Sequence, residues 1–309
     1  MLLAHSRRKK GDQTMKILIN LIGEQPIPNL LPALFLKPDK IINLYTDRTT
    51  RHTERLQQIL QNSENIKTSP YDFSDVFNRL EVEIAKHSDE ELIFNISGGT
   101  KLMSIALFQF AVQNNSEAIY LQSERNKSVL YSLKEENGIL TYNNKELPEL
   151  IDIDTFLKVH IGKYHFAQSD KLDYGMQFEN EIIKILRENN FEIMQGVKPN
   201  GEGDQLEIDA VIKLKGTNNI AIAEIKVGDK NNERPKKGID QLSTAGGREY
   251  LGIYTKKFLI LRNETNNSIK KLAKAHNIIV IDKLSTNKKN ELTETSKNIL
   301  IKKLTDNLS

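Results

Sequence analysis

Short apolar runs alternate with amphipathic segments through the first 135 residues, and this alternation restricts the possible folds more than any other feature. The intervening segments repeat apolar residues at helical spacing, as Val76, Leu80 and Ile84 do. Three apolar runs of strand length are "KILINLI", "KIINLYT" and "ELIFNIS". Continuous apolar runs are typical of strands covered on both faces. The pattern predicts an α/β fold with a mostly parallel, Rossmann-like sheet in the N-terminal half.

A chain of 309 residues is long for a single core, so we expect two domains. Periodicity weakens between about 135 and 172, where we place the join. The predicted organisation is a flexible extension (1–14), a ligand-sensing domain (15–145), a linker (146–172) and a second α/β domain (173–309).

The composition argues against several classes of protein. No apolar run approaches the roughly 20 residues that a membrane helix needs, and the first residues place apolar side chains before charges, opposite to a secretory signal. Cysteine is absent, which excludes disulfides and thiolate metal sites and is compatible with the cytoplasm. The histidines are scattered, so a catalytic metal is expected to use oxygen ligands, which suits Mg²⁺ or Mn²⁺.

The run "IAIAEIKV" (220–227) reads as a strand whose apolar face ends in charges. Alternation places Ile220, Ile222, Glu224 and Lys226 on one face. If this strand pairs with "LEIDAVIKL" (206–214) through the intervening turn, Asp209 lies beside Glu224. A divalent cation held by the two carboxylates relieves their repulsion, and Lys226 is then suited to orient water or to neutralise transition-state charge.

Two further side chains point to the same centre. Glu179 flanks the apolar stripe of the preceding helix, so we expect it to reach the metal directly or through water. Gln241 is expected to begin the helix after the strand and to position the nucleophile or the backbone. The alternative for Glu224 and Lys226 is a surface salt bridge of little energetic value.

These residues resemble the pattern of the PD-(D/E)xK nuclease superfamily over about 172–285. The proline of the pattern is replaced by Ile208. The resemblance implies a restriction-endonuclease-like domain with Glu179, Asp209, Glu224, Lys226 and Gln241 in the catalytic site. It also implies a metal held by Asp209, Glu224 and the backbone carbonyl of Ile225, with Glu179 as a further ligand.

The N-terminal half carries a candidate ligand site at the ends of its strands. "NISGGTK" places a glycine turn before a helix N-terminus, which attracts phosphates or polar nucleotide edges. Neither a Walker A loop nor a dinucleotide fingerprint is present, and an ordinary strand-to-helix turn is an equally good interpretation. In open parallel sheets ligands bind at the carboxyl ends of strands. The residues expected to line this pocket are Glu24, Gln25, Thr46, Asp47, Arg48, Thr49, Gly98, Gly99, Thr100 and Lys101.

Together with the second-domain motif, "NLIGEQPIPNLLPALFLKPDKIINLYTDRT" and "NISGGTKLMSIAL" resemble the CARF-domain nucleases of type III CRISPR systems. The single-CARF ancillary nuclease group is the best match. The resemblance implies a homodimer that binds one cyclic oligoadenylate, usually cyclic tetra-adenylate, on its two-fold axis. It further implies activation of Mn²⁺- or Mg²⁺-dependent cleavage of DNA or RNA in antiviral defence.

Two other classes of function stay open from the sequence. One is a non-catalytic regulator that joins a nucleotide sensor to a nucleic-acid-binding module, and the other is a restriction or repair nuclease unrelated to CRISPR defence. Twelve Lys or Arg against five Asp or Glu between Lys226 and Lys274 suit a polyanionic partner, although a solvated lysine-rich surface accounts for them equally well.

Overall fold

The computed structural model describes residues 14–309 except 88, 125, 168–172, 202–205 and 229–232. Apart from Thr14, the predicted N-terminal extension lies outside the described residues. The chain divides into two compact units, each described below by itself. The first unit comprises the described residues up to 23 with 28–120 and 131–144, and the second comprises 24–27, 121–130 and 145–309.

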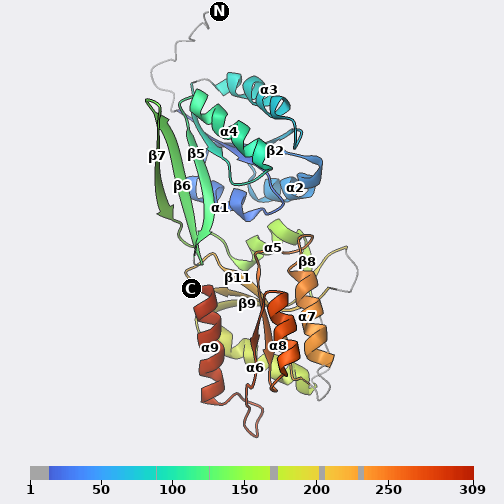
Figure 1. Cartoon of the computed structure of the whole chain (residues 1–309). Coiled ribbons are helices and arrows are strands. Elements are labelled where there is room, and N and C mark those ends of the chain that lie inside the picture. The colour runs from blue at the N-terminus through green and yellow to red at the C-terminus, as the bar shows by residue number, and fades with distance from the viewer. Residues whose placement is uncertain (1–13, 88, 125, 168–172, 202–205, 229–232) are drawn as a thin grey trace, which may run out of the picture. The chain divides into compact units, whose positions relative to one another are not determined.

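The first unit is built on a seven-stranded sheet with the order β3-β2-β1-β4-β5-β6-β7 (Figure 1). Its elements are β1 (Lys16–Leu21), α1 (Ile27–Leu36), β2 (Lys40–Tyr45), α2 (Thr50–Ile59), β3 (Ser63–Lys67), α3 (Phe73–Ile84), β4 (Glu91–Asn95), α4 (Lys101–Gln113), β5 (Glu117–Glu124), β6 (Lys127–Glu136) and β7 (Ile139–Glu146).

The first five strands in the sheet order, β3, β2, β1, β4 and β5, are parallel, as the strand–helix alternation predicts. Two residues separate β5 from β6 and β6 from β7, and so short a connection joins only antiparallel neighbours. The sheet is therefore mixed at this end. The parallel part confirms the predicted Rossmann-like fold, whereas β3 and β7 were not predicted.

The helices cover both faces of this sheet. Val76 and Leu80 of α3 and Met103 of α4 belong to one core with Ile17 and Ile19 of β1. The opposite face carries α1 and α2, because side chains on that face of the strands bond to Pro28 O and to Gln57. Continuous apolar strands are the expected consequence of covering both faces.

Four asparagines cross the centre of the sheet in one row. The strand register aligns Asn20 with Asn43 and Asn95, and Asn43 with Asn65. Asn95 Nδ2 donates to Asn20 Oδ1 at 2.9 Å, Asn20 Nδ2 to Asn43 Oδ1 at 3.3 Å, and Asn43 Nδ2 to Asn65 Oδ1 at 3.0 Å. A shift of register would leave the buried amides of Asn20, Asn43 and Asn95 unpaired, which is costly. The row therefore fixes the register of β3, β2, β1 and β4. At the end of the row in β4, Asn95 Oδ1 also accepts a hydrogen bond from Ser97 N in the turn that follows.

The second unit contains a six-stranded mixed sheet with the order β13-β12-β11-β10-β9-β8. Its elements are α5 (Ile153–Ile161), β8 (Tyr164–Phe166), α6 (Tyr174–Glu188), β9 (Phe191–Pro199), β10 (Ile208–Leu214), β11 (Ile220–Lys226), α7 (Glu233–Ala245), β12 (Lys256–Leu261), α8 (Asn267–Ala275), β13 (Ile278–Ile281) and α9 (Glu294–Leu308).

The two faces of β11 pack against different helices. Ala221, Ala223 and Ile225 share a core with residues of α6 and α9. On the other face, Gly238 of α7 approaches Glu224, since a Cβ built at Gly238 lies 3.7 Å from Glu224 Cβ. Alternation along the strand thus separates a dry core from a face that carries charge.

The structure differs from the sequence-based expectation in two details. The segment predicted as a linker (146–172) contains α5 and β8. Gln241 is the ninth residue of α7, which begins at Glu233, so the expectation that Gln241 begins this helix is wrong. In the part of the chain that the structure describes, no helix is both long enough and apolar enough to cross a bilayer.

Candidate metal centre and ligand-binding edge

The hairpin of β10 and β11 brings two carboxylates face to face. The antiparallel register pairs Ala210 with Ala223. The next pair of that register places Asp209 opposite Glu224. Asp209 Oδ2 accepts hydrogen bonds from Ile225 N at 2.8 Å and from Lys226 Nζ at 2.7 Å. The structure therefore brings together the two residues on which the predicted metal site depends.

Lys226 lies between these carboxylates. Its Nζ is also 2.7 Å from Glu224 Oε2, and the Glu224 side chain is only 2% exposed. Glu224 is buried and Lys226 is 24% exposed, so the pair is partly buried rather than the surface salt bridge considered as an alternative. Removing either partner of a buried pair leaves an uncompensated charge and is strongly destabilising, unlike the loss of a surface bridge.

Burial and charge perturb the ionisation of this cluster. Burial, followed by the neighbouring Asp209 charge, raises the pKa of Glu224 well above its usual range. Burial alone lowers the pKa of Lys226, but the Glu224 and Asp209 carboxylates outweigh it, and the net result is a raised pKa. Clusters of this kind are found at functional sites and also in structural ion-pair networks.

Glu179 on α6 faces the same cluster. Burial, followed by the Asp209 charge, raises the pKa of Glu179 to about 7. A hydrogen bond from Gln195 acts in the opposite direction, because it stabilises the charged form. Gln195 Nε2 donates to Glu179 Oε1 at 2.9 Å. Gln195 was not predicted: it lies on β9 opposite Ala210, and its relation to Glu179 arises only when β9 and α6 pack together. Its sequence signal is weak, because β9 also carries the charged residues Glu192 and Lys198.

Gln241 lies on the helix that covers this face of the sheet. Gly238, one helical turn before it, packs against Glu224 and Lys226, and residues three apart share a helix face. Gln241 Oε1 is buried and has no hydrogen-bond partner among the described residues. The position is compatible with the predicted positioning role, and no contact with Asp209 or Lys226 is observed.

The oxygen donors at this centre determine whether it can hold a divalent cation. No group of three or more His, Cys, Asp or Glu side chains in the described ranges is arranged to hold a metal ion. However, Glu224 Oε2 is a buried oxygen paired with Lys226 Nζ at 2.7 Å, and Asp209 stands opposite Glu224 in the hairpin. The nearby donors are carboxylate oxygens, which Mg²⁺ and Mn²⁺ prefer. The residues fit a cation that competes with the Lys226 ammonium for Asp209 and Glu224.

The raised pKa of Glu179 predicts a pH-dependent stability in the metal-free protein. Between about pH 4.5 and pH 7 the folded state keeps a proton that the unfolded state has lost, so stability falls as pH rises through this window. Glu179→Gln is expected to reduce the loss between pH 5 and pH 8 by on the order of 2 kcal/mol. Urea unfolding in chelator measures it. The control is Glu188→Gln at the exposed end of the same helix, which should keep the wild-type slope; equal slopes for all three proteins would contradict the assignment.

At the candidate ligand edge of the first unit, the backbone of the turn after β4 packs closely against the backbone at the end of β1. A Cβ built on Gly98 lies 1.9 Å from Leu21 O and 2.9 Å from Gly23 N. Gly99 adopts φ +70°, a conformation that favours glycine. The turn after β4 is therefore packed directly against the end of β1, which only glycine allows.

The predicted threonines of this edge have their hydroxyls engaged within the fold. Thr100 Oγ1 donates to Pro70 O at 2.7 Å and caps α4 by accepting from Met103 N. Thr49 Oγ1 accepts from Thr46 N at 3.0 Å, and both of these threonines are buried. Their observed contacts shape the turns.

The other predicted residues differ in exposure. Asp47, Arg48, Gly99 and Lys101 are exposed, and Asp47 pairs with Lys67 at 2.6 Å. Thr46–Thr49 and Gly98–Lys101 follow β2 and β4, whose carboxyl ends lie on either side of β1. Glu24 and Gln25 follow β1 but belong by their contacts to the second unit.

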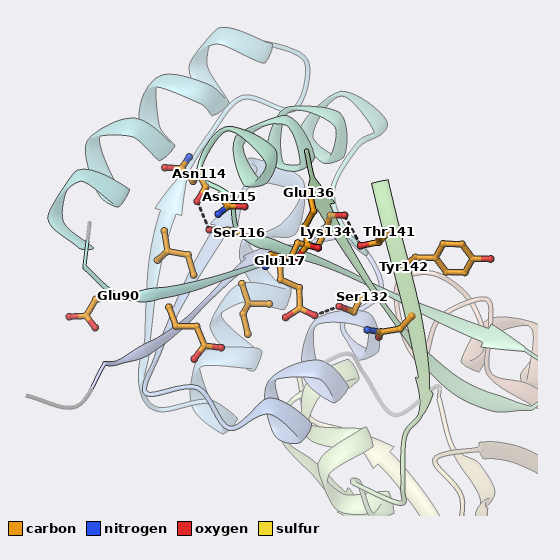
Figure 2. A pocket seen from close by; sticks show the side chains of 14 residues that line it. Glu90, Asn114, Asn115, Ser116, Glu117, Ser132, Lys134, Glu136, Thr141 and Tyr142 are labelled. Carbon is orange, nitrogen blue, oxygen red and sulfur yellow. Dashed lines mark hydrogen bonds and ion pairs between the residues drawn. The ribbon is translucent and has the colours of Figure 1, made fainter. Parts of the chain in front are cut away.

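A groove of about 630 Å³ lies at a different edge of the first unit (Figure 2). It is lined by Glu91 and Ser116 at the amino ends of β4 and β5, and by Ser132 and Thr141 of β6 and β7. Ligands of open parallel sheets bind at carboxyl ends, so this groove is separate from the predicted ligand edge.

Comparison with known proteins identifies the first unit. Residues 17–148 match the family model of the Card1 CARF domain. The N-terminal unit is a CARF domain. The match spans all seven strands of the first sheet except the first residue of β1, so the mixed end formed by β6 and β7 belongs to the domain. No curated protein matches the sequence.

Solved structures share the fold over nearly the whole chain. Can2 from Sulfobacillus thermosulfidooxidans, in complex with cyclic tetra-adenylate, matches with a TM-score of 0.73 at 15% identity, covering 95% of this chain and 99% of Can2. Protein VC1899 from Vibrio cholerae matches with a TM-score of 0.67 at 13% identity, over 94% of this chain and 98% of its own. The CARF domain and the second sheet thus occur together in a Can2-like fold.

Proposed function

We propose that this CARF protein is a metal-dependent endonuclease activated by a cyclic oligoadenylate, in type III CRISPR defence. The observation that carries the enzymatic part is the pairing of Asp209 with Glu224 beside Lys226. The fold of Can2, a protein seen with cyclic tetra-adenylate, supports the choice of activator. The substrate is DNA, RNA or both.

In this proposal Asp209 and Glu224 hold Mn²⁺ or Mg²⁺, with Glu179 and the carbonyl of Ile225 as further ligands. The metal, when bound, supplies Lewis-acid stabilisation of the phosphoryl oxygens and a more acidic bound water. Lys226 keeps its proton and stabilises negative charge that develops on the phosphate. Gln195 orients Glu179 through its hydrogen bond, and Gln241 faces the same centre from α7.

The activator is proposed to bind the CARF domain at the carboxyl ends of β1, β2 and β4. Exposed cations at Arg48 and Lys101 and the N-terminus of α4 suit the phosphates of a cyclic oligonucleotide. The turns held by Thr46, Thr49 and Thr100 give this edge a fixed shape. Because a cyclic tetra-adenylate is itself symmetric, a homodimer with two equivalent CARF domains is the expected assembly.

A panel of cleavage reactions tests the proposal. Labelled single- and double-stranded DNA and RNA are incubated with each cyclic oligoadenylate and with Mn²⁺ or Mg²⁺. We expect scission that needs both an activator and a metal. Binding of nucleic acid in chelator without scission under any condition would favour the non-catalytic regulator, and scission independent of every activator would favour a nuclease outside CRISPR defence.

A further inference from the structure

A second polar row crosses the sheet next to the candidate metal centre. In the β9–β10 register Ile208 faces Val197, so Glu207 faces Lys198, and the two form an ion pair of 3.2 Å. The β8–β9 register pairs His165 with Lys198. Continued three residues past Ala210 and Ala223, the β10–β11 register places Lys226 beside Glu207, the residue just before β10. The row therefore reads Lys226, Glu207, Lys198, His165 across four strands.

The neighbouring row, which contains the two carboxylates of the metal centre, has no charged side chain on β9 or β8. From Glu224 and Asp209 it continues to Gly196 and Ala167, where Ala167 N donates to Gly196 O at 2.7 Å. Beyond the two carboxylates this row has neither charge nor bulk. Of these two rows, the outer one is therefore where the described residues offer charged contacts to a phosphate chain that leaves the metal centre toward β8.

Lys198 is the cation of this row that stands apart from the metal centre. Adjacent strands are ~4.8 Å apart, so Lys198 lies about 10 Å from Lys226 across the sheet. Its partner Glu207 has a 43% exposed side chain, and an ion pair with so exposed a member contributes at most about 1 kcal/mol. A phosphate oxygen can replace that carboxylate at little cost, with a charge-assisted hydrogen bond as the gain.

Resting on the proposed nuclease function, we propose that Lys198 binds a backbone phosphate neighbouring the scissile one, with Glu207 as its counter-ion when no nucleic acid is bound. The ligand is the phosphodiester backbone of a nucleic acid strand, contacted without regard to base. Glu207 then acts against binding, so its neutralisation strengthens the complex. A purely structural ion pair would show the reverse, because the loss of either partner would weaken the fold and the complex alike.

The test measures fluorescence anisotropy of a labelled single-stranded oligonucleotide in chelator across a range of salt concentrations. Lys198→Ala is expected to weaken binding about 5- to 10-fold and to reduce the slope of log K against log salt by about 0.7. Lys198→Arg should retain binding, and Glu207→Gln should tighten it. The control Lys215→Ala removes one exposed lysine at the other end of β10 and should keep the wild-type slope.

Equal affinities and slopes for Lys198→Ala and Lys215→Ala would overturn the assignment, as would weaker binding by Glu207→Gln. Parallel cleavage reactions by the wild type in Mn²⁺ with each cyclic oligoadenylate separate this inference from the proposed function. Cleavage without a Lys198 effect on binding refutes only the phosphate site. A Lys198 effect on binding in a protein that never cleaves refutes only the nuclease.

Discussion

Asp209→Asn is expected to lower the rate of nucleic acid cleavage by at least about 1,000-fold while leaving binding of the cyclic oligoadenylate unchanged. The amide keeps the shape of the carboxylate but removes the charge that both Lys226 Nζ and a metal require. Asp209 Oδ2 also accepts from Ile225 N, and the amide oxygen can still accept this bond. Glu224 still pairs with Lys226 at 2.7 Å, so no charge is left uncompensated, and the loss should be one of metal binding rather than of fold.

Initial rates on labelled substrate, with saturating activator and Mn²⁺, measure the effect. Asp240→Asn is the matched control, because it makes the same chemical change at an exposed position of α7 in the same unit. Asp240→Asn should cleave at the wild-type rate. Full activity in Asp209→Asn would remove the carboxylate from the mechanism.

Gly98→Ala is expected to abolish activation by damaging the CARF domain at its ligand edge. The new Cβ would meet Leu21 O at 1.9 Å and Gly23 N at 2.9 Å. Both atoms belong to the backbone at the end of β1, which cannot move aside as a flexible side chain can. We expect a loss of at least about 3 kcal/mol in the stability of this unit and at least about 100-fold in activator affinity.

Gly138→Ala is the matched control for this variant. Gly138 also lies in a turn of the first unit, but its Cβ would meet nothing within 4 Å. Its φ of +80° leaves only a backbone strain of about 1 kcal/mol. Thermal unfolding and activator titration compare the two proteins. A Gly98→Ala protein that binds activator like Gly138→Ala would contradict the close backbone contact.

The parallel core of the CARF domain was predictable because its strands are apolar on both faces. Strands at the sheet edges lack this signal. The sequence of β3 is "SENIK", and every residue of β7 is exposed, so no burial pattern marks them. The predicted linker contained no long apolar run, and α5 and β8 are short elements. Local sequence therefore identified the buried strands of the CARF sheet, and it left that sheet's edge strands and the short helix α5, although largely buried, unassigned.

In the candidate metal centre, the residues that share one strand could be predicted from the sequence. The contacts that form only when different elements pack together could not. Alternation alone placed Glu224 and Lys226 on one face, and hairpin pairing added Asp209. The contact between Gln195 and Glu179 depends on how β9 meets α6, which no local pattern encodes. The asparagine row is a similar case: Asn20, Asn43 and Asn95 look like interruptions of apolar runs, Asn65 lies in the polar strand β3, and the bonded partners are 22 to 75 residues apart in sequence.

Binding of Mn²⁺ to the purified protein tests the central claim most directly. Electron paramagnetic resonance of free Mn²⁺, titrated against the wild type and Glu224→Gln, reports the number and affinity of sites without any substrate. The account predicts at least one Mn²⁺ site per chain in the wild type and its loss or a drop in affinity of at least about 100-fold in Glu224→Gln. Equal Mn²⁺ binding by the two proteins would contradict a cation held between Asp209 and Glu224.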